Sequence, residues 1–171
     1  KQKNYPLFIE LCKSIAIKYD KINFISVGHG PEFEKMLHYA KENNLDGKLK
    51  FMGNTIDAGK IMEENIDIFL LTSYKEGLPN VVMEAMSFGI PVISTNVGGV
   101  NELIEHKKTG YLVPSNDLKG LVDYCSQLIK SAKLRQEIGH NGRRFIKDQF
   151  SSRKMVNEFE VIFNKFLLNK H

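Results

Sequence analysis

The sequence is poor in the features that mark several classes of protein. It has two cysteines, Cys12 and Cys125, far apart and in apolar segments, so we expect reduced thiols with no metal-ligand spacing. No apolar run approaches the ~20 residues of a membrane-spanning helix, and the polar start predicts no signal peptide. The net charge of +4 is mild and no basic groove interleaved with aromatics is visible, which argues against a nucleic-acid partner.

What is present is an ordinary globular composition with alternating segment types. The chain has 171 residues, enough for one domain with a core, and 42% of them are hydrophobic. Hydrophobic periodicity predicts strands over 22–27, 48–52, 66–71, 91–94 and 111–113, and helices over 7–19, 32–43, 57–65, 81–88, 100–104, 118–130, 133–147 and 153–168. This alternation predicts a parallel sheet with helices on both faces.

The stretch from Thr72 to Gly99 organises the rest of the chain. A strand, a loop, a short helix and another strand follow one another there, with Pro79 predicted at the first helical position and Gly89 as a left-handed cap. In open α/β sheets, ligands bind where such loops leave the carboxyl ends of the strands.

Two carboxylates lie in this unit, Glu76 in the loop and Glu84 in the helix. Asn80, Glu84 and Ser87 form a polar stripe at helical spacing. Because apolar residues flank the stripe, we expect Glu84 to be mostly covered and to need partners, for which sugar hydroxyls are suited.

The predicted helix start, next to Leu78 and Asn80, offers free N–H groups to phosphate. Together with the two acids this indicates a nucleotide-sugar pocket. The alternative, that Glu76 and Glu84 are ordinary solvated acids, stays open on spacing alone.

At this point the residues carry a resemblance. The segment E-G-L-P-N-V-V-M-E-A-M-S-F-G-I-P-V-I-S-T, then G-G-V-N-E-L-I and T-G-Y-L-V, resembles the E-x7-E signature of the retaining GT-B glycosyltransferases called glycosyl transferases group 1. The likeness covers nearly the whole chain but only one half of a typical member. It implies an α/β fold, a Rossmann-like doubly wound parallel sheet forming the C-terminal half of a GT-B fold, with C-terminal helices.

The resemblance also implies a domain organisation. Residues 1–150 would be the donor nucleotide-sugar-binding domain, whose own first strand is missing. Residues 151–171 would be a C-terminal helix, with Met155, Phe159, Ile162, Phe163 and Phe166 on one face, that packs across to an absent N-terminal acceptor domain.

Roles for individual residues follow from the same resemblance. Glu76 would contact hydroxyls of the transferred sugar as the catalytic residue, and Glu84 the ribose hydroxyls. Lys3 would reach the donor diphosphate, although a frayed terminal lysine is the alternative. Backbone groups around Gly77, Leu78, Pro79 and Asn80 would meet the phosphates.

A second set of residues would border the nucleotide. The loop at Gly28 would line the pocket, Asn54 and Thr55 would read the base edge, and Lys60 would lie near the nucleotide unless it is a solvated helix lysine. Asp57 would cap the next helix. Gly98 and Gly99 would form a second phosphate-facing turn, and we read Glu102 as structural.

The implied activity is transfer from a nucleotide-diphosphate sugar to an acceptor, with retention by front-face attack. No D-x-D pair precedes the central unit, so no metal and no cofactor are expected. The acceptor would be a cell-surface polysaccharide or lipid-linked saccharide, with the protein cytoplasmic and at the inner face of the membrane, where peripheral association is left open. The rival readings are a nucleotide-binding module without transferase activity and a GT-B-fold nucleotide-sugar epimerase.

Overall fold

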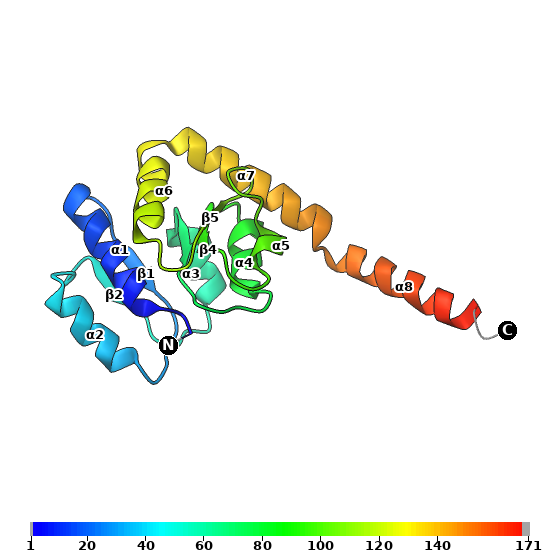
Figure 1. The fold of residues 1–171 in the computed structure, drawn as a ribbon, viewed down its shortest axis with the longest axis horizontal. Helices are drawn as coiled ribbons and strands as arrows, with labels where there is room; N and C mark the ends of the chain where they lie inside the picture. Colours follow the sequence, from blue (N-terminus) through cyan, green and yellow to red (C-terminus); the bar gives the residue numbers. More distant parts are fainter. Residues whose placement is uncertain (1, 169–171) are drawn as a thin grey trace.

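The computed structural model describes residues 2–168 as an α/β body followed by a projecting helix (Figure 1). The strands are β1 (Phe24–Ser26), β2 (Leu49–Phe51), β3 (Phe69–Leu71), β4 (Val92–Thr95) and β5 (Tyr111–Val113). The helices are α1 (Tyr5–Lys18), α2 (Phe33–Glu42), α3 (Ala58–Asn65), α4 (Asn80–Ser87), α5 (Val100–Leu103), α6 (Leu118–Lys130), α7 (Ala132–Gln149) and α8 (Ser152–Leu168). Each predicted strand and helix is therefore found, with ends shifted by a few residues.

All strand pairs are parallel, as the alternation of segments predicts. β1 pairs with β2, and β4 lies between β3 and β5. The sequence predicts one sheet, whereas the ladders form two. The difference arises because β1 and β3 do not pair, and each keeps one edge without a strand neighbour among the described residues.

Helices cover both faces of the three-stranded sheet. Val92 and Ile93 are consecutive in β4 and both fully buried, so their side chains point to opposite faces. Ile93 packs in a core cluster with α1 and α6, while Val92 packs in a second cluster with α4 and α5. A strand buried on both faces is typical of parallel sheets in doubly wound folds, which confirms the predicted fold class.

The cysteines lie in the first of these clusters. Cys12 and Cys125 are buried and free, as predicted. Burial raises the pKa of the Cys125 thiol to about 12 and raises that of Cys12 further above its ordinary value. Both therefore stay protonated and act as small apolar side chains.

Two local predictions are wrong. Pro79, predicted at the first helical position, is instead the N-cap of α4, one position before its first helical residue. Asp57 occupies the N-cap of α3, but its side chain makes no capping hydrogen bond. On α2, the apolar Leu37 is exposed, whereas Met36 and Ala40 are buried; the covered face of α2 is narrower than its apolar pattern.

The last helix, α8, leaves the body and carries exposed apolar side chains (Figure 1). Met155, Phe159, Ile162 and Phe163 are each more than half exposed, and α8 adds no residue to either core cluster. The apolar face predicted from their spacing is therefore present and uncovered; the Phe166 side chain lies outside the described residues. None of the helices described between residues 2 and 168 combines the length and apolar character that crossing a bilayer requires.

Candidate functional site

The loops that follow the parallel strands meet at one edge of each sheet. The loop after β3 carries Ser73 and Glu76, and it leads into the N-terminus of α4. Because the strands are parallel, their carboxyl ends share this edge, where ligands of doubly wound folds bind.

Glu76 is held by two donors at this edge. Lys3 Nζ lies 2.7 Å from Glu76 Oε1, and Ser73 Oγ donates to the same oxygen at 2.5 Å. The glutamate side chain is 8% exposed and the lysine side chain 50% exposed. A buried carboxylate needs such partners, because an unpaired buried charge is unfavourable. The structure therefore brings two of the predicted site residues, Lys3 and Glu76, into direct contact.

The turn that carries Lys3 is bound to the end of β3. Tyr74 N donates to Gln2 O at 2.8 Å, and Thr72 Oγ1 donates to Lys3 O at 3.0 Å. Asn4 adopts a left-handed φ of 49° and is buried, and its Nδ2 donates to Asn116 Oδ1 at 3.1 Å. Lys3 is therefore anchored through its backbone and is not a frayed terminal residue.

Glycines allow a second loop to pack against Glu76. Gly98 has a φ of +54°, and a Cβ added there would overlap the carbonyl oxygen of Glu76. Gly99 N donates to Gly77 O at 2.9 Å. The turn at Gly98 and Gly99, predicted to face phosphate, is thus in close backbone contact with the loop that carries Glu76.

The N-terminus of α4 is open next to this pair. Pro79 is the N-cap and no side chain caps the helix. Gly77, Leu78 and Asn80 are exposed there. Uncapped N–H groups and the helix dipole favour an anion at this point.

Glu84 does not have the environment predicted from the sequence. Asn80, Glu84 and Ser87 form the expected stripe, but all three are exposed, and Glu84 has no side-chain partner among the described residues. The expectation of a covered carboxylate is wrong, because the apolar residues that flank the stripe turn inward and leave it in solvent. The structural role expected for Glu102 is not found either. Its exposed side chain has no hydrogen-bonding or charged partner in residues 2–168.

The remaining predicted residues form a separate group at the ends of β1 and β2. Gly28, with a φ of 116°, donates its N–H to Gly53 O at 2.8 Å, which places its loop beside Asn54 and Thr55. Lys60 is exposed and lies 4.0 Å from Glu64, a solvent-exposed pair of small energetic weight. Within the described chain, no hydrogen bond or ion pair joins this group to Lys3 and Glu76.

The sequence interpretation missed the residues that support Glu76. Ser73 lies three positions before Glu76, a local spacing that could have been noticed. Thr95, whose Oγ1 donates to Ser73 O at 2.6 Å, comes from β4 and could be found only once the strand order was known.

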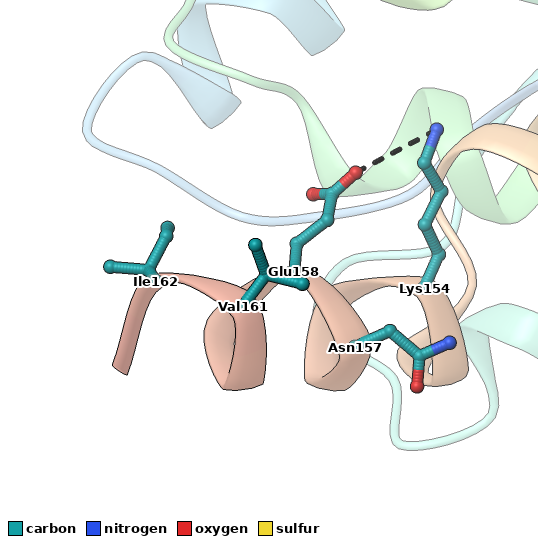
Figure 2. A pocket seen from close by; sticks show the side chains of 5 residues that line it. All are labelled: Lys154, Asn157, Glu158, Val161 and Ile162. Carbon is teal, nitrogen blue, oxygen red and sulfur yellow. Dashed lines mark ion pairs between the residues drawn. The ribbon is translucent and has the colours of Figure 1, made fainter. Parts of the chain in front are cut away.

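Two surface hollows lie outside this site. One, of about 400 Å³, is lined by Lys154, Asn157, Glu158, Val161 and Ile162, whose side chains are drawn in Figure 2. All five belong to α8, and Lys154 pairs with Glu158 at 3.9 Å. The second, about 430 Å³, lies where β5 meets α6, near His106 and Tyr124. Among the described residues, His, Cys, Asp and Glu form no group of three that could hold a metal ion.

The fold and the site together define a class of protein. A doubly wound α/β domain with a cation, a carboxylate and an open helix N-terminus at its strand ends has features that phosphate-binding sites use. The family described as "Glycosyl transferases group 1" matches residues 1–145. The chain therefore belongs to this family of glycosyltransferases, as its E-x7-E-like segment indicates.

Known relatives and solved structures agree with this assignment. The chain is 36% identical over 137 residues to N-acetyl-alpha-D-glucosaminyl L-malate synthase of Bacillus anthracis, covering 80% of this chain and 36% of that protein. It is 37% identical over 103 residues to the Capsular polysaccharide biosynthesis glycosyltransferase CapM of Staphylococcus aureus, covering 60% of this chain and 27% of CapM.

A mutant of S. aureus TarM, solved in complex with fondaparinux, alpha-GlcNAc-glycerol and UDP, superposes with a TM-score of 0.88 at 25% identity. That match covers 96% of this chain and 33% of the TarM chain. It confirms the GT-B type of fold. The chain spans about a third of the length of these three proteins.

Proposed function

We propose that this chain is the donor-binding half of a retaining glycosyltransferase that uses a nucleotide-diphosphate sugar. The observation that carries the proposal is the ion pair between Lys3 and Glu76 beside the uncapped start of α4. A cation and a helix N-terminus suit a diphosphate, and a carboxylate suits sugar hydroxyls. The likeness to a TarM structure that contains UDP supports a uridine nucleotide as the donor.

The site residues then take distinct roles. Lys3 and the N–H groups around Gly77, Leu78 and Asn80 hold the diphosphate, with Pro79 fixing the start of the helix. Glu76 accepts hydrogen bonds from hydroxyls of the transferred sugar through Oε2, because Oε1 is already occupied. Glu84, which is exposed, accepts hydrogen bonds from the ribose hydroxyls.

The base would lie on the other group of loops. Gly28 allows the chain to approach it closely, and Asn54 and Thr55 meet its edge. Lys60, on the first turns of α3, lies beside the nucleotide.

The reaction would proceed by front-face attack with retention. The acceptor hydroxyl forms the new glycosidic bond as the bond to the diphosphate breaks, and its proton passes to the departing diphosphate. Lys3 and the α4 N-terminus stabilise the charge that develops on the diphosphate. Glu76 orients the sugar and forms no covalent bond, and the proposal needs neither a metal nor a cofactor.

The rest of the protein would supply the acceptor site. We place an additional parallel strand, upstream of Lys1, between the open edges of β1 and β3, since neither edge has a strand neighbour among the described residues and both strands share one core cluster. The uncovered apolar face of α8 would pack on an N-terminal acceptor domain. The likeness to CapM favours a cell-surface or lipid-linked saccharide as acceptor, with transfer on the cytoplasmic side of the membrane.

Nucleotide titration of the ¹⁵N-labelled chain tests the proposal. UDP, GDP, ADP and UDP-hexoses are added, and amide shifts are followed by NMR. We expect shifts of the amides of Gly77, Leu78 and Asn80 and of Gly53–Thr55, and tighter binding of one UDP-hexose than of UDP. Glu76→Gln should remove the advantage of the sugar, whereas Glu160→Gln, on exposed α8, should not. Shifts confined to other surfaces would refute the assignment.

A further inference from the structure

The two donors to Glu76 differ in how firmly they are held. Lys3 Nζ is at the end of a flexible side chain that is 50% exposed. Ser73 is fully buried, and its short side chain reaches Glu76 Oε1 at 2.5 Å. The serine hydroxyl is therefore less able than the lysine amine to move away from Glu76.

Ser73 is itself fixed from the sheet. Thr95 Oγ1, on β4, donates to the carbonyl oxygen of Ser73 at 2.6 Å, and Thr95 is also fully buried. The hydrogen bonds thus run from β4 to the Ser73 backbone and from the Ser73 hydroxyl to Glu76. This chain ties the orientation of the carboxylate to the central strand of the three-stranded sheet.

Both donors use one carboxylate oxygen. Glu76 Oε1 accepts from Lys3 and Ser73, whereas Oε2 has no hydrogen-bond partner within residues 2–168. An ionised carboxylate accepts on both oxygens, so Oε2 remains available for a ligand hydroxyl.

We propose that Ser73 is a positioning residue that fixes Oε1 of Glu76, so that Oε2 faces a hydroxyl of the transferred sugar. The inference rests on the proposed function. A diphosphate attracts Lys3 away from Glu76, and the glutamate then keeps its orientation through Ser73 alone. Ser73 therefore acts on the binding of the sugar and not on that of the nucleotide.

The consequence is a selective loss when the hydroxyl is removed. Ser73→Ala should weaken the binding of a UDP-hexose by roughly tenfold, at the lower end of what a hydrogen bond to a charged group contributes. Binding of UDP should change by less than about twofold, because UDP lacks the sugar that Glu76 contacts.

Calorimetric titration of the 171-residue chain measures both affinities. The probes are UDP and whichever of UDP-glucose, UDP-galactose and UDP-N-acetylglucosamine binds the wild type more tightly than UDP. Ser73→Thr keeps a hydroxyl and should restore most of the affinity for the sugar nucleotide. In the Glu76→Gln background, Ser73→Ala should cause no further loss, because the two residues act as one unit.

A matched control comes from another serine. Ser126 Oγ, on α6, is buried and has no hydrogen-bond partner in the described part of the chain. Ser126→Ala should leave both affinities at the wild-type values, which separates the role of Ser73 from the general effect of losing a buried hydroxyl. If Ser73→Ala does not fold, Ser73→Cys, which donates weakly, carries the same expectation.

The possible results separate the two hypotheses. Equal losses for UDP and UDP-hexose in Ser73→Ala, or losses that add to those of Glu76→Gln, would overturn the positioning role while the proposed function stands. Failure of the chain to bind UDP, or an unchanged sugar advantage in Glu76→Gln, would instead overturn the proposed function, and the positioning role with it.

Discussion

Replacing Gly98 by alanine should displace the loop that carries Glu76. A Cβ at this position would overlap the carbonyl oxygen of Glu76 and approach its carbonyl carbon to 2.8 Å. These are backbone atoms, so they cannot rotate away as the end of a side chain could. The φ of +54° at Gly98 adds strain, because a residue with a Cβ rarely adopts that conformation.

The expected loss of stability follows from these two effects. The left-handed conformation costs an alanine about 1–2 kcal/mol, and overpacking a tight contact typically costs about 1–3 kcal/mol. Alanine also restricts the unfolded chain, which offsets about 0.4–1 kcal/mol. We therefore expect Gly98→Ala to lower the free energy of unfolding by about 1–5 kcal/mol, a large share of the ~5–15 kcal/mol of a typical domain.

Urea unfolding followed by circular dichroism measures this loss. Gly30→Ala is the control, because a Cβ at Gly30 meets no atom within 4 Å and its φ is not in the left-handed region. It should change the stability by less than about 0.5 kcal/mol. Amide shifts of Ser73, Glu76 and Gly77 should move only in Gly98→Ala. A Gly98→Ala protein as stable as wild type, with these amides unmoved, would show that the two loops are not in tight contact.

Two other positions give separate predictions. Gly139→Ala should destabilise the protein by about 1–3 kcal/mol, because the new Cβ would overlap the carbonyl oxygen of Gly89. This loss is expected although alanine favours a helix over glycine by about 1 kcal/mol. The control is Gly59→Ala, in α3 with open space around the position, which should be neutral or stabilising in the same urea assay. Burial lowers the pKa of His106, whose Nδ1 accepts from Leu112 N at 3.0 Å. The unfolded chain therefore takes the proton first, and this contribution to stability, complete above the ordinary pKa of ~6.5, is lost as pH falls toward the folded pKa. The difference between the unfolding midpoints at pH 7.5 and pH 5.5 should be smaller in His106→Asn than in wild type. An equal difference in the two proteins would contradict the role of His106.

Much of the fold could be predicted from hydrophobic periodicity and from the residues that favour turns. The strand at 111–113 and the helix at 118–130 agree with the structure at both ends, because each is an apolar pattern bounded by polar or turn residues. Gly89 takes a φ of 77° after α4, as a left-handed cap requires. These features are local, so the sequence contains all the information that they need.

Features that depend on contacts across the chain could not be predicted in the same way. Asn4 meets Asn116 across 112 positions, and Thr95 reaches Ser73 from the neighbouring strand. The error over Glu84 has another source. Its helix packs against α3, α5, α7 and the sheet, but none of these covers the stripe that carries Glu84, and helical periodicity gives the direction of a side chain but not what covers it.

The contrast between Glu76 and Glu84 bears on why the ion pair between Lys3 and Glu76 is present. A buried ion pair contributes little to stability, because the loss of hydration offsets the attraction, and apolar residues of similar volume often serve as well. Glu76 nevertheless occupies a nearly buried position that requires a lysine, a serine and a glycine contact to accommodate it. Such an arrangement at the carboxyl end of β3 is accounted for more readily by a ligand that uses the free oxygen than by folding. Glu84 needs no such support, since solvent already stabilises its charge, and the structure by itself therefore favours a binding role for Glu76 more strongly than for Glu84.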